Sequence, residues 1–357
     1  MVDMKLMGGV AIVAVLIIAG GAVFLVGGDD SSESGPIEVT DALGRTVTME
    51  SKTERIVSTG CLETEMLCGM GASDRIVAVS NDEGVYDCPS SIVGFSDDDF
   101  PEAIVDGLAD GSIESVGPTA QQTAEGLAAI DADLFILSYM SYTWSGLGDQ
   151  LDVLGLTYIV TFNGANLTEI YDSIEMIGTA IGEEDEAEDL VDEMQAVIDA
   201  VNEKIEGAAT QDVAIFMSPY YACGQEYVLG TLIEELGSNN AFSSISGPYE
   251  MVSTEGIAQA NPDVLIYTAM DMMGLNSNEH IASLQTDPIL SELDAVKNDR
   301  VYAATGYADQ ALTFASQRFV EAYAMFAMMI YPDEFDTELP AVVGDDYQTY
   351  LEWIVGE

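Results

Sequence analysis

The feature that most constrains the fold of this chain is a pair of similar segments. Residues 123–138 and 253–268 align without a gap, so that Glu255 follows Glu125 by 130 residues. In both segments the glutamate precedes a glycine, and an aspartate further on opens an apolar run. Each copy is typical of a helix that turns into a buried strand. A repeat that occurs only twice, at this spacing, indicates two similar domains and excludes a solenoid.

Short β-branched runs alternate with helical patterns along most of the chain. The predicted strands lie at 55–58, 76–80, 133–139, 157–162, 212–217, 263–268 and 301–305. Such alternation is typical of parallel sheets with helices on both faces. Residues 37–49 alternate apolar and polar side chains around Gly44, which predicts a β-hairpin. We therefore expect an α/β protein with two doubly wound parallel-sheet lobes.

The stretch between the two groups of strands, residues 166–207, has neither proline nor a strand pattern. Its apolar spacing predicts two helices, and the second, after the acidic run 183–189, would be roughly 36 Å long. The helix dipole favours acidic residues in the first turns. A helix of this length could join two lobes or lie on the surface of one domain, and periodicity alone leaves both open.

The N-terminus holds a run of 23 uncharged residues, 6–28. As a helix it would span roughly 30 Å of hydrocarbon. Lys5 precedes it and two aspartates follow, so we expect the rest of the chain to lie outside the cell membrane. A cleaved signal peptide, which would release the protein, is the alternative. No cysteine lies near the end of the run, which argues against a lipid anchor.

These patterns divide the chain into four parts. Residues 1–36 form the membrane segment with an acidic tether, 37–165 the first lobe, 166–207 the helical linker, and 208–357 the second lobe.

The charge balance excludes several classes of partner. Acidic residues outnumber basic ones 63 to 9, for a net charge of −54. Nucleic acids and anionic lipid surfaces require clustered lysine and arginine. A single histidine and four cysteines leave little material for a catalytic triad or a histidine-rich zinc site. We therefore expect a monomeric binding protein with no catalytic residues, no resident metal and no cofactor, adapted to extracellular or saline conditions.

Several segments, taken in order, resemble the class III extracytoplasmic solute-binding proteins of ABC importers, which serve siderophores, haem and cobalamin. The matching segments are 37–58, 67–80, the two Glu-Gly helices, 235–242, 260–267 and 287–303. The resemblance runs from about residue 37 to about residue 330. It implies two α/β lobes joined by one long rigid helix, here 183–207, with the ligand in a cleft between the lobes.

The resemblance also implies that one surface glutamate in each lobe docks onto arginines of the permease. By position these are Glu125 and Glu255. Both stand at the start of equivalent helices, so they could engage a two-fold symmetric partner. The alternative is that each carboxylate simply favours the dipole of its own helix.

Ligands of doubly wound lobes contact the loops at the carboxyl ends of strands. In this chain those loops are rich in tyrosine, tryptophan and methionine and contain no lysine or arginine. The candidate ligand-binding residues are Ser58, Cys61, Glu63, Tyr86, Tyr139, Met140, Tyr142, Trp144, Tyr220, Tyr221, Tyr227, Met270 and Tyr307. Aromatic and thioether surfaces suit a large, flat, partly apolar ligand, and we expect about half of these aromatic residues to contact it.

The sequence thus predicts a receptor that captures an iron chelate (siderophore or haem) or cobalamin and delivers it to an ABC permease and its ATPase. The absence of arginine from these loops favours a corrinoid, haem or a neutral-to-cationic chelate over a highly anionic one. Alternatives are a binding protein for a free metal ion or small solute, and a metal-dependent extracellular enzyme that would use Glu63, Asp87 and Asp271. Cys61 with Cys88 is a better candidate for a disulfide than Cys61 with Cys68. Both Cys61 and Cys88 are expected on loops on the cleft side of an exported protein.

Overall fold

The computed structural model describes residues 35–82, 92–93, 95, 100–270 and 273–355. Its first sheet has the strand order β5-β4-β3-β6-β7 and is parallel throughout. The strands are β3 (Ile56–Ser58), β4 (Ile76–Val79), β5 (Glu114–Ser115), β6 (Leu134–Leu137) and β7 (Tyr158–Val160). Outside this sheet, β1 (Ile37–Thr40) and β2 (Thr46–Met49) pair antiparallel, which confirms the predicted hairpin.

The second sheet has the order β11-β9-β8-β12-β13-β14, with β10 also paired to β8. Its strands are β8 (Asp212–Phe216), β9 (Tyr221–Cys223), β10 (Asn239–Asn240), β11 (Tyr249–Met251), β12 (Val264–Tyr267), β13 (Val301–Ala304) and β14 (Val342–Val343). Strands β8, β12 and β13 run parallel, as predicted, and the short strands β10 and β14, which the sequence did not predict, join them in parallel. The sequence did not predict the antiparallel pair β9 and β11 at one edge, because strands of three residues have too few positions to show alternation.

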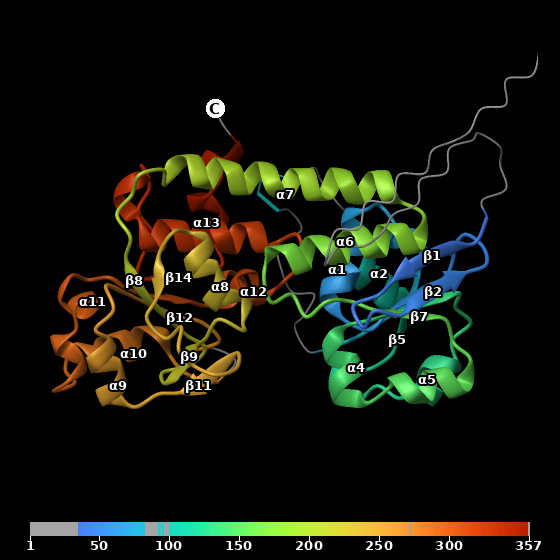
Figure 1. Cartoon of the computed structure of the whole chain (residues 1–357), viewed down its shortest axis with the longest axis horizontal. Helices are drawn as coiled ribbons and strands as arrows, with labels where there is room; N and C mark the ends of the chain where they lie inside the picture. Colours follow the sequence, from blue (N-terminus) through green and yellow to red (C-terminus); the bar gives the residue numbers. More distant parts are fainter. Residues whose placement is uncertain (1–34, 83–91, 94, 96–99, 271–272, 356–357) are drawn as a thin grey trace, which may run out of the picture. The chain divides into compact units, whose positions relative to one another are not determined.

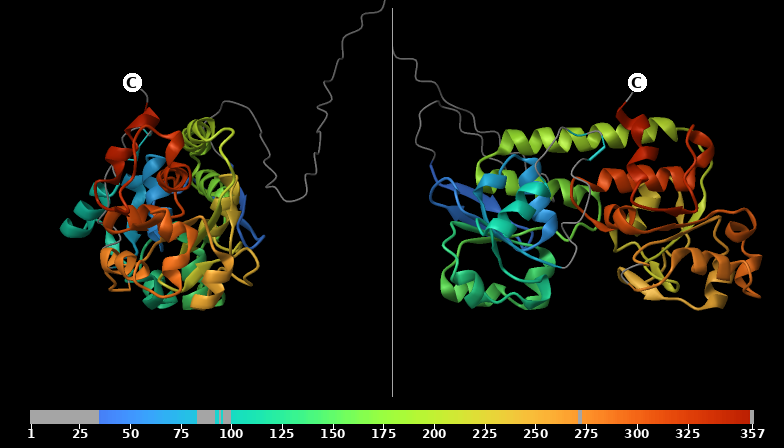
Figure 2. Two further views of the ribbon diagram at one scale, coloured as in Figure 1. Left: turned by 90° about the vertical axis from the view of Figure 1, so that its left-hand side faces the viewer. Right: turned by 180° about the vertical axis from the view of Figure 1, so that it is seen from behind.

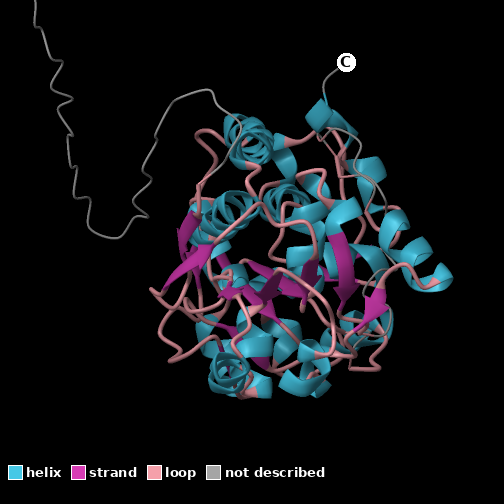
Figure 3. Cartoon of the chain, turned by 90° about the vertical axis from the view of Figure 1, so that its right-hand side faces the viewer, coloured by secondary structure: helices cyan, strands magenta, loops and turns pink. Residues whose placement is uncertain are grey.

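Helices cover both faces of the strands (Figure 3). Figures 1 and 2 show the two sheets side by side, each with its own helices. The longer helices are α1 (Cys61–Gly69), α2 (Glu102–Asp110), α6 (Leu167–Ile181), α7 (Glu184–Lys204), α8 (Val228–Glu235), α10 (Ser277–Leu284), α12 (Gly306–Thr313) and α13 (Phe319–Ile330). Shorter ones are α3 (Ala124–Ala128), α4 (Tyr139–Ser145), α5 (Gly148–Leu154), α9 (Thr254–Ala260) and α11 (Asp294–Lys297). The two-lobe α/β fold is thereby confirmed.

The sequence repeat has a physical basis in how α3 and α9 begin. The side chains of Thr123 and Ser253 each accept a hydrogen bond from the backbone N–H three residues on, of Gly126 and Gly256, at 3.1 Å in both cases. Such a cap satisfies one of the backbone donors that a helix start leaves without a partner. The Glu-Gly pair therefore occupies the same two positions of the first turn in each lobe.

The repeated aspartates hold equivalent strand pairs together. The Asp133 carboxylate accepts the N–H of Arg55 at 3.0 Å, just before β3, and Asp263 accepts the N–H of Asp212, the first residue of β8, at 2.9 Å. In return, the backbone N–H groups of both aspartates donate to the carbonyls of these same two residues. The repeat thus specifies the parallel pairs β3–β6 and β8–β12 in the same way.

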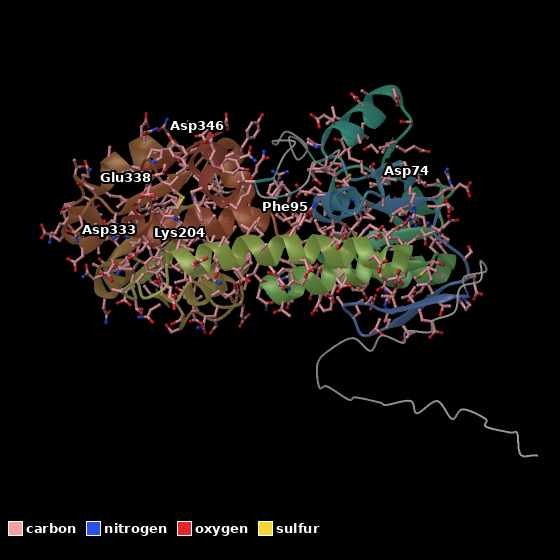
Figure 4. All side chains as sticks on the ribbon, turned by 90° about the horizontal axis from the view of Figure 1, so that it is seen from above. Asp74, Phe95, Lys204, Asp333, Glu338 and Asp346 are labelled. Carbon is pink, nitrogen blue, oxygen red and sulfur yellow. The ribbon has the colours of Figure 1, made fainter. Side chains whose placement is uncertain are left out.

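Helix α7 is the long helix that the sequence predicted. It packs against α6 near the first sheet and against α13 near the second. Leu190, near its start, lies close to Gly69 at the end of α1. Lys204, its last residue, is labelled in Figure 4, and its ammonium lies 5.8 Å from the ring centre of Trp353. At about 30 Å in length, α7 contacts both lobes.

The predicted membrane helix at 6–28 lies outside the described residues. Among the residues that are described, none belongs to a helix with both the length and the apolar character needed to cross a bilayer.

Candidate ligand-binding site

The carboxyl edge of the first sheet has a switch point between β3 and β6. From β3 the chain continues to β4 and β5 on one side, and to β6 and β7 on the other. In open α/β sheets, ligands bind outside the carboxyl ends of the strands at such a point. The segments that meet here are Thr59–Gly60 with the start of α1, and Ser138 with the start of α4.

A network of buried hydroxyl and amide groups lines this switch point. The backbone N–H of Ser138 donates to Thr59 Oγ1 at 3.1 Å. The Thr59 carbonyl accepts from Ser141 Oγ at 3.1 Å and from Gln122 Nε2 at 2.9 Å. Ser138 Oγ also caps α4 by accepting from the N–H of Ser141 at 3.0 Å. These bonds hold the two loops and α4 in one arrangement.

Glu63 lies at the centre of this edge, in the first turn of α1. Its carboxylate is buried, and Oε1 accepts a hydrogen bond from Thr161 Oγ1, just after β7, at 2.6 Å. Oε2 has no partner among the described residues, and burial raises the pKa of Glu63 above its usual range. Gly60 makes room for it, since a Cβ there would lie 2.2 Å from Glu63 Oε2.

The second lobe presents a different surface, formed by the antiparallel pair of β9 and β11, which α8 and β10 separate in the chain. Tyr221 lies opposite Met251 in the ladder, and Tyr249 lies opposite Cys223, so these four side chains share one face. The ring centres of Tyr221 and Tyr227 lie 6.4 Å and 6.2 Å from that of Tyr249, both edge to face. The exposed large apolar residues of this strand pair and its start are Tyr220 (43%), Tyr221 (37%), Tyr249 (47%) and Met251 (61%).

The structure places the other predicted ligand residues at different depths. Tyr139 and Met140 are exposed in the first turn of α4, and Cys61, Tyr142, Tyr227 and Tyr307 are half-buried. Ser58 and Met270 are fully buried and have partners within the protein. The hydroxyl of Ser58, the last residue of β3, donates to the Gly60 carbonyl at 2.9 Å, and Met270, which follows β12, packs in the hydrophobic core of the second lobe. Tyr86 and the side chain of Trp144 lie outside the described part.

Cys61 carries a free thiol, and Cys88, its expected disulfide partner, lies outside the described residues, so that pairing stays a prediction. Burial raises the pKa of the Cys61 thiol, and the nearby carboxylates of Glu63, Glu65 and Asp82 raise it further. In the described part of the chain, no three or more His, Cys, Asp or Glu side chains come together as a metal site would require.

A buried ionic cluster that the sequence did not reveal joins the two lobes behind this edge. Arg318, at the start of α13, lies 2.7 Å from Glu65 Oε1 of α1 and 3.5 Å from Glu321 Oε2. All three side chains are buried, and Gln317 Nε2 donates to the Glu65 carbonyl at 2.7 Å. Burial raises the pKa of Glu321, while Arg318 opposes that shift. Glu65 and Arg318 are 253 positions apart, too far for any local pattern to pair them.

Glu125 and Glu255 are exposed in the first turns of α3 and α9. Within the described residues neither carboxylate takes part in an ion pair or a side-chain hydrogen bond. Both are therefore available to a partner.

The comparisons with known proteins agree with this architecture. Residues 56–308 match the model of the periplasmic binding protein family. An uncharacterized ABC transporter substrate-binding lipoprotein, YvrC of Bacillus subtilis (strain 168), is 26% identical over 311 residues, covering 85% of this chain and 88% of the relative.

Solved structures share the fold. A periplasmic solute-binding protein from Staphylococcus epidermidis ATCC 12228 superposes with a TM-score of 0.62 at 22% identity, over 79% of this chain and 100% of the other. The periplasmic heme-binding protein RhuT from Roseiflexus sp. RS-1 does so with a TM-score of 0.60 at 19% identity, over 79% and 99%. The chain belongs to the periplasmic binding protein family, whose members bind a substrate and are not enzymes.

Proposed function

We propose that this protein is the extracytoplasmic substrate-binding component of an ABC importer, and that it captures a metal chelate (an iron siderophore or haem) or cobalamin. The exposed aromatic and thioether surface on the β9–β11 strand pair carries the proposal. Tyrosine and methionine side chains of this kind suit a large, flat, partly apolar ligand. An exposed apolar cluster on a soluble protein usually marks an interaction site.

The relatives support this assignment. The Bacillus subtilis relative is an ABC transporter substrate-binding lipoprotein by name, and the Roseiflexus neighbour is a heme-binding protein. We propose that residues 37–165 and 208–357 act as the two lobes, with the ligand held between the switch point of the first lobe and the β9–β11 strand pair of the second. Residues 6–28 would hold the protein at the membrane.

Delivery would use the paired glutamates. Glu125 and Glu255 occupy equivalent positions of the repeat, and both are exposed. A permease with one positive patch in each half would meet one carboxylate from each lobe.

A fluorescence titration tests the cargo. The chain has two tryptophans: Trp144 in α4, and Trp353, which packs on Phe335 with a ring-centre distance of 5.1 Å near the C-terminus. We expect cobalamin, haem or a ferric siderophore to quench the full-length protein saturably, and the Trp144→Phe variant to lose most of that signal. Failure of every chelate to bind would refute the cargo assignment.

A further inference from the structure

We infer that the cargo is a cationic chelate, or a neutral one rich in hydrogen-bond donors, because the first-lobe edge offers it acceptors and no positive charge. This inference rests on the proposed function and narrows it to one class of substrate. Two observations support it: the unpartnered acceptor atoms at the β3–β6 switch point, and the partners of the lysines and arginines.

Two buried polar atoms at the switch point lack partners among the described residues, and both are acceptors. They are Glu63 Oε2 and Gln122 Oε1, on side chains that are 3% and 4% exposed. Gln122 is held by its other atom, since Nε2 donates to the Thr59 carbonyl. An acceptor without a partner at a buried site costs free energy, which a donor or a positive charge on a ligand would recover.

All eight lysines and arginines in the described part of the chain already have partners. Arg45 pairs with Asp41, Lys52 and Arg75 with Glu183, Arg55 with Asp131, and Lys297 with Glu292; Arg318 pairs with Glu65 and Glu321, Arg300 donates to the Met329 and Ile330 carbonyls, and Lys204 lies over Trp353. Arg318 lies 2.7 Å from Glu65 of α1, and two buried carboxylates face it. None of the eight described cations is among the groups bonded at the switch point.

Among the groups bonded at the switch point there is one carboxylate and no positive charge. That carboxylate is Glu63, whereas Glu65 pairs with Arg318 behind the edge. On the second lobe, the exposed tyrosine rings would present their faces to the ligand, and aromatic faces attract cations. Both halves of the proposed site thus favour positive charge, whereas a ferric catecholate trianion or the propionates of haem would be repelled.

A matched pair of probes tests this. Ferrioxamine B carries one protonated amine, and its N-acetyl derivative is the same ferric hydroxamate without that charge. We expect the wild-type protein at about pH 8 to bind ferrioxamine B roughly tenfold more tightly than the acetylated form, the effect of one charge interaction at the edge of a partly buried site. In Glu63→Gln the ratio should fall toward one, while affinity for the acetylated form is kept. Glu125→Gln, which removes an exposed carboxylate away from the switch point, should leave the ratio unchanged.

A second measurement covers the case in which Glu63→Gln does not fold. In the wild-type protein the ratio should fall as the pH is lowered and Glu63 takes up a proton; Cys61, Glu65 and Asp82 are the titratable groups nearby. Equal affinity for the two probes, or tighter binding of haem or ferric enterobactin than of ferrioxamine B, would overturn the inference and leave the proposed function standing. Binding of none of these probes, with cobalamin also failing, would overturn both.

Discussion

The two lobes share one architecture and differ in the chemistry of their carboxyl edges. In the first lobe the edge is a buried network of hydroxyl, amide and carboxylate groups centred on Thr59 and Glu63. In the second lobe it is the β9–β11 strand pair, which exposes tyrosine and methionine side chains. The helix caps and the strand-pairing aspartates make equivalent hydrogen bonds in both lobes, because these contacts fix the strands and helices of each lobe. The loops after the strands carry no such constraint, so each lobe could acquire its own surface.

The largest expected effect concerns the cluster that joins the lobes. Arg318→Ala leaves Glu65 and Glu321 buried without a counter-charge, so we expect the free energy of unfolding to fall by about 3–5 kcal/mol, measured by urea denaturation. The control is Lys297→Ala, which breaks a surface pair with Glu292 and should cost less than about 1 kcal/mol. Similar losses in the two variants would show that the cluster does not hold the lobes together.

The second-lobe surface can be removed without touching the core. Tyr249→Ala with Met251→Ala deletes two exposed side chains, so affinity for the chelate should fall by about 10- to 100-fold. The thermal unfolding midpoint should change little. Val153→Ala, at a residue that is 86% exposed in α5, is the matched control and should leave affinity unchanged. Unchanged affinity in the double variant would show that the β9–β11 strand pair is not part of the ligand-binding site.

The buried carboxylate of Glu63 at the first-lobe edge should lower the free energy of unfolding, whereas the exposed β9–β11 strand pair has no such cost. Burial raises the folded-state pKa of Glu63, so the carboxylate destabilises the fold wherever the pH lies above that raised pKa. Glu63→Gln should therefore raise the free energy of unfolding at about pH 8, since its amide oxygen can still accept from Thr161. The gain should shrink as the pH falls through the raised pKa toward the unfolded value. A difference in unfolding free energy that is independent of pH would contradict this account.

The smallest effect tests the symmetry of the repeat. Thr123→Ala and Ser253→Ala each remove one helix cap of the same geometry, so each should lower the free energy of unfolding by about 1 kcal/mol. The measurement is chemical denaturation of the two single variants side by side. A loss confined to one lobe would mean that the caps are equivalent in geometry but not in energy.

Much of the frame could be predicted from the sequence, because its signals are local. Apolar runs placed β3, β4, β6, β7, β8, β12 and β13 within one or two residues of their observed ends, and apolar spacing placed α6 and α7. The Glu-Gly repeat is likewise a local signal, and it predicts two similar lobes. The resemblance built on these segments is confirmed by the family match.

The site was less predictable, because its residues depend on burial and on distant partners. Tyr249 and Met251 join the proposed surface only because β11 pairs with β9, and nothing local marks such short strands. Ser58 and Met270 stood in the right loops but turned inward against the sheet ends.

The sequence by itself therefore determined the fold class, the order of the strands along the chain and the paired glutamates, since hydrophobic periodicity and helix caps act over a few residues. The tertiary structure alone decided which loop side chains reach the surface, and that Arg318 lies between Glu65 and Glu321 rather than facing a ligand. Those outcomes depend on contacts between residues up to 253 positions apart. Only the packed chain brings such residues together.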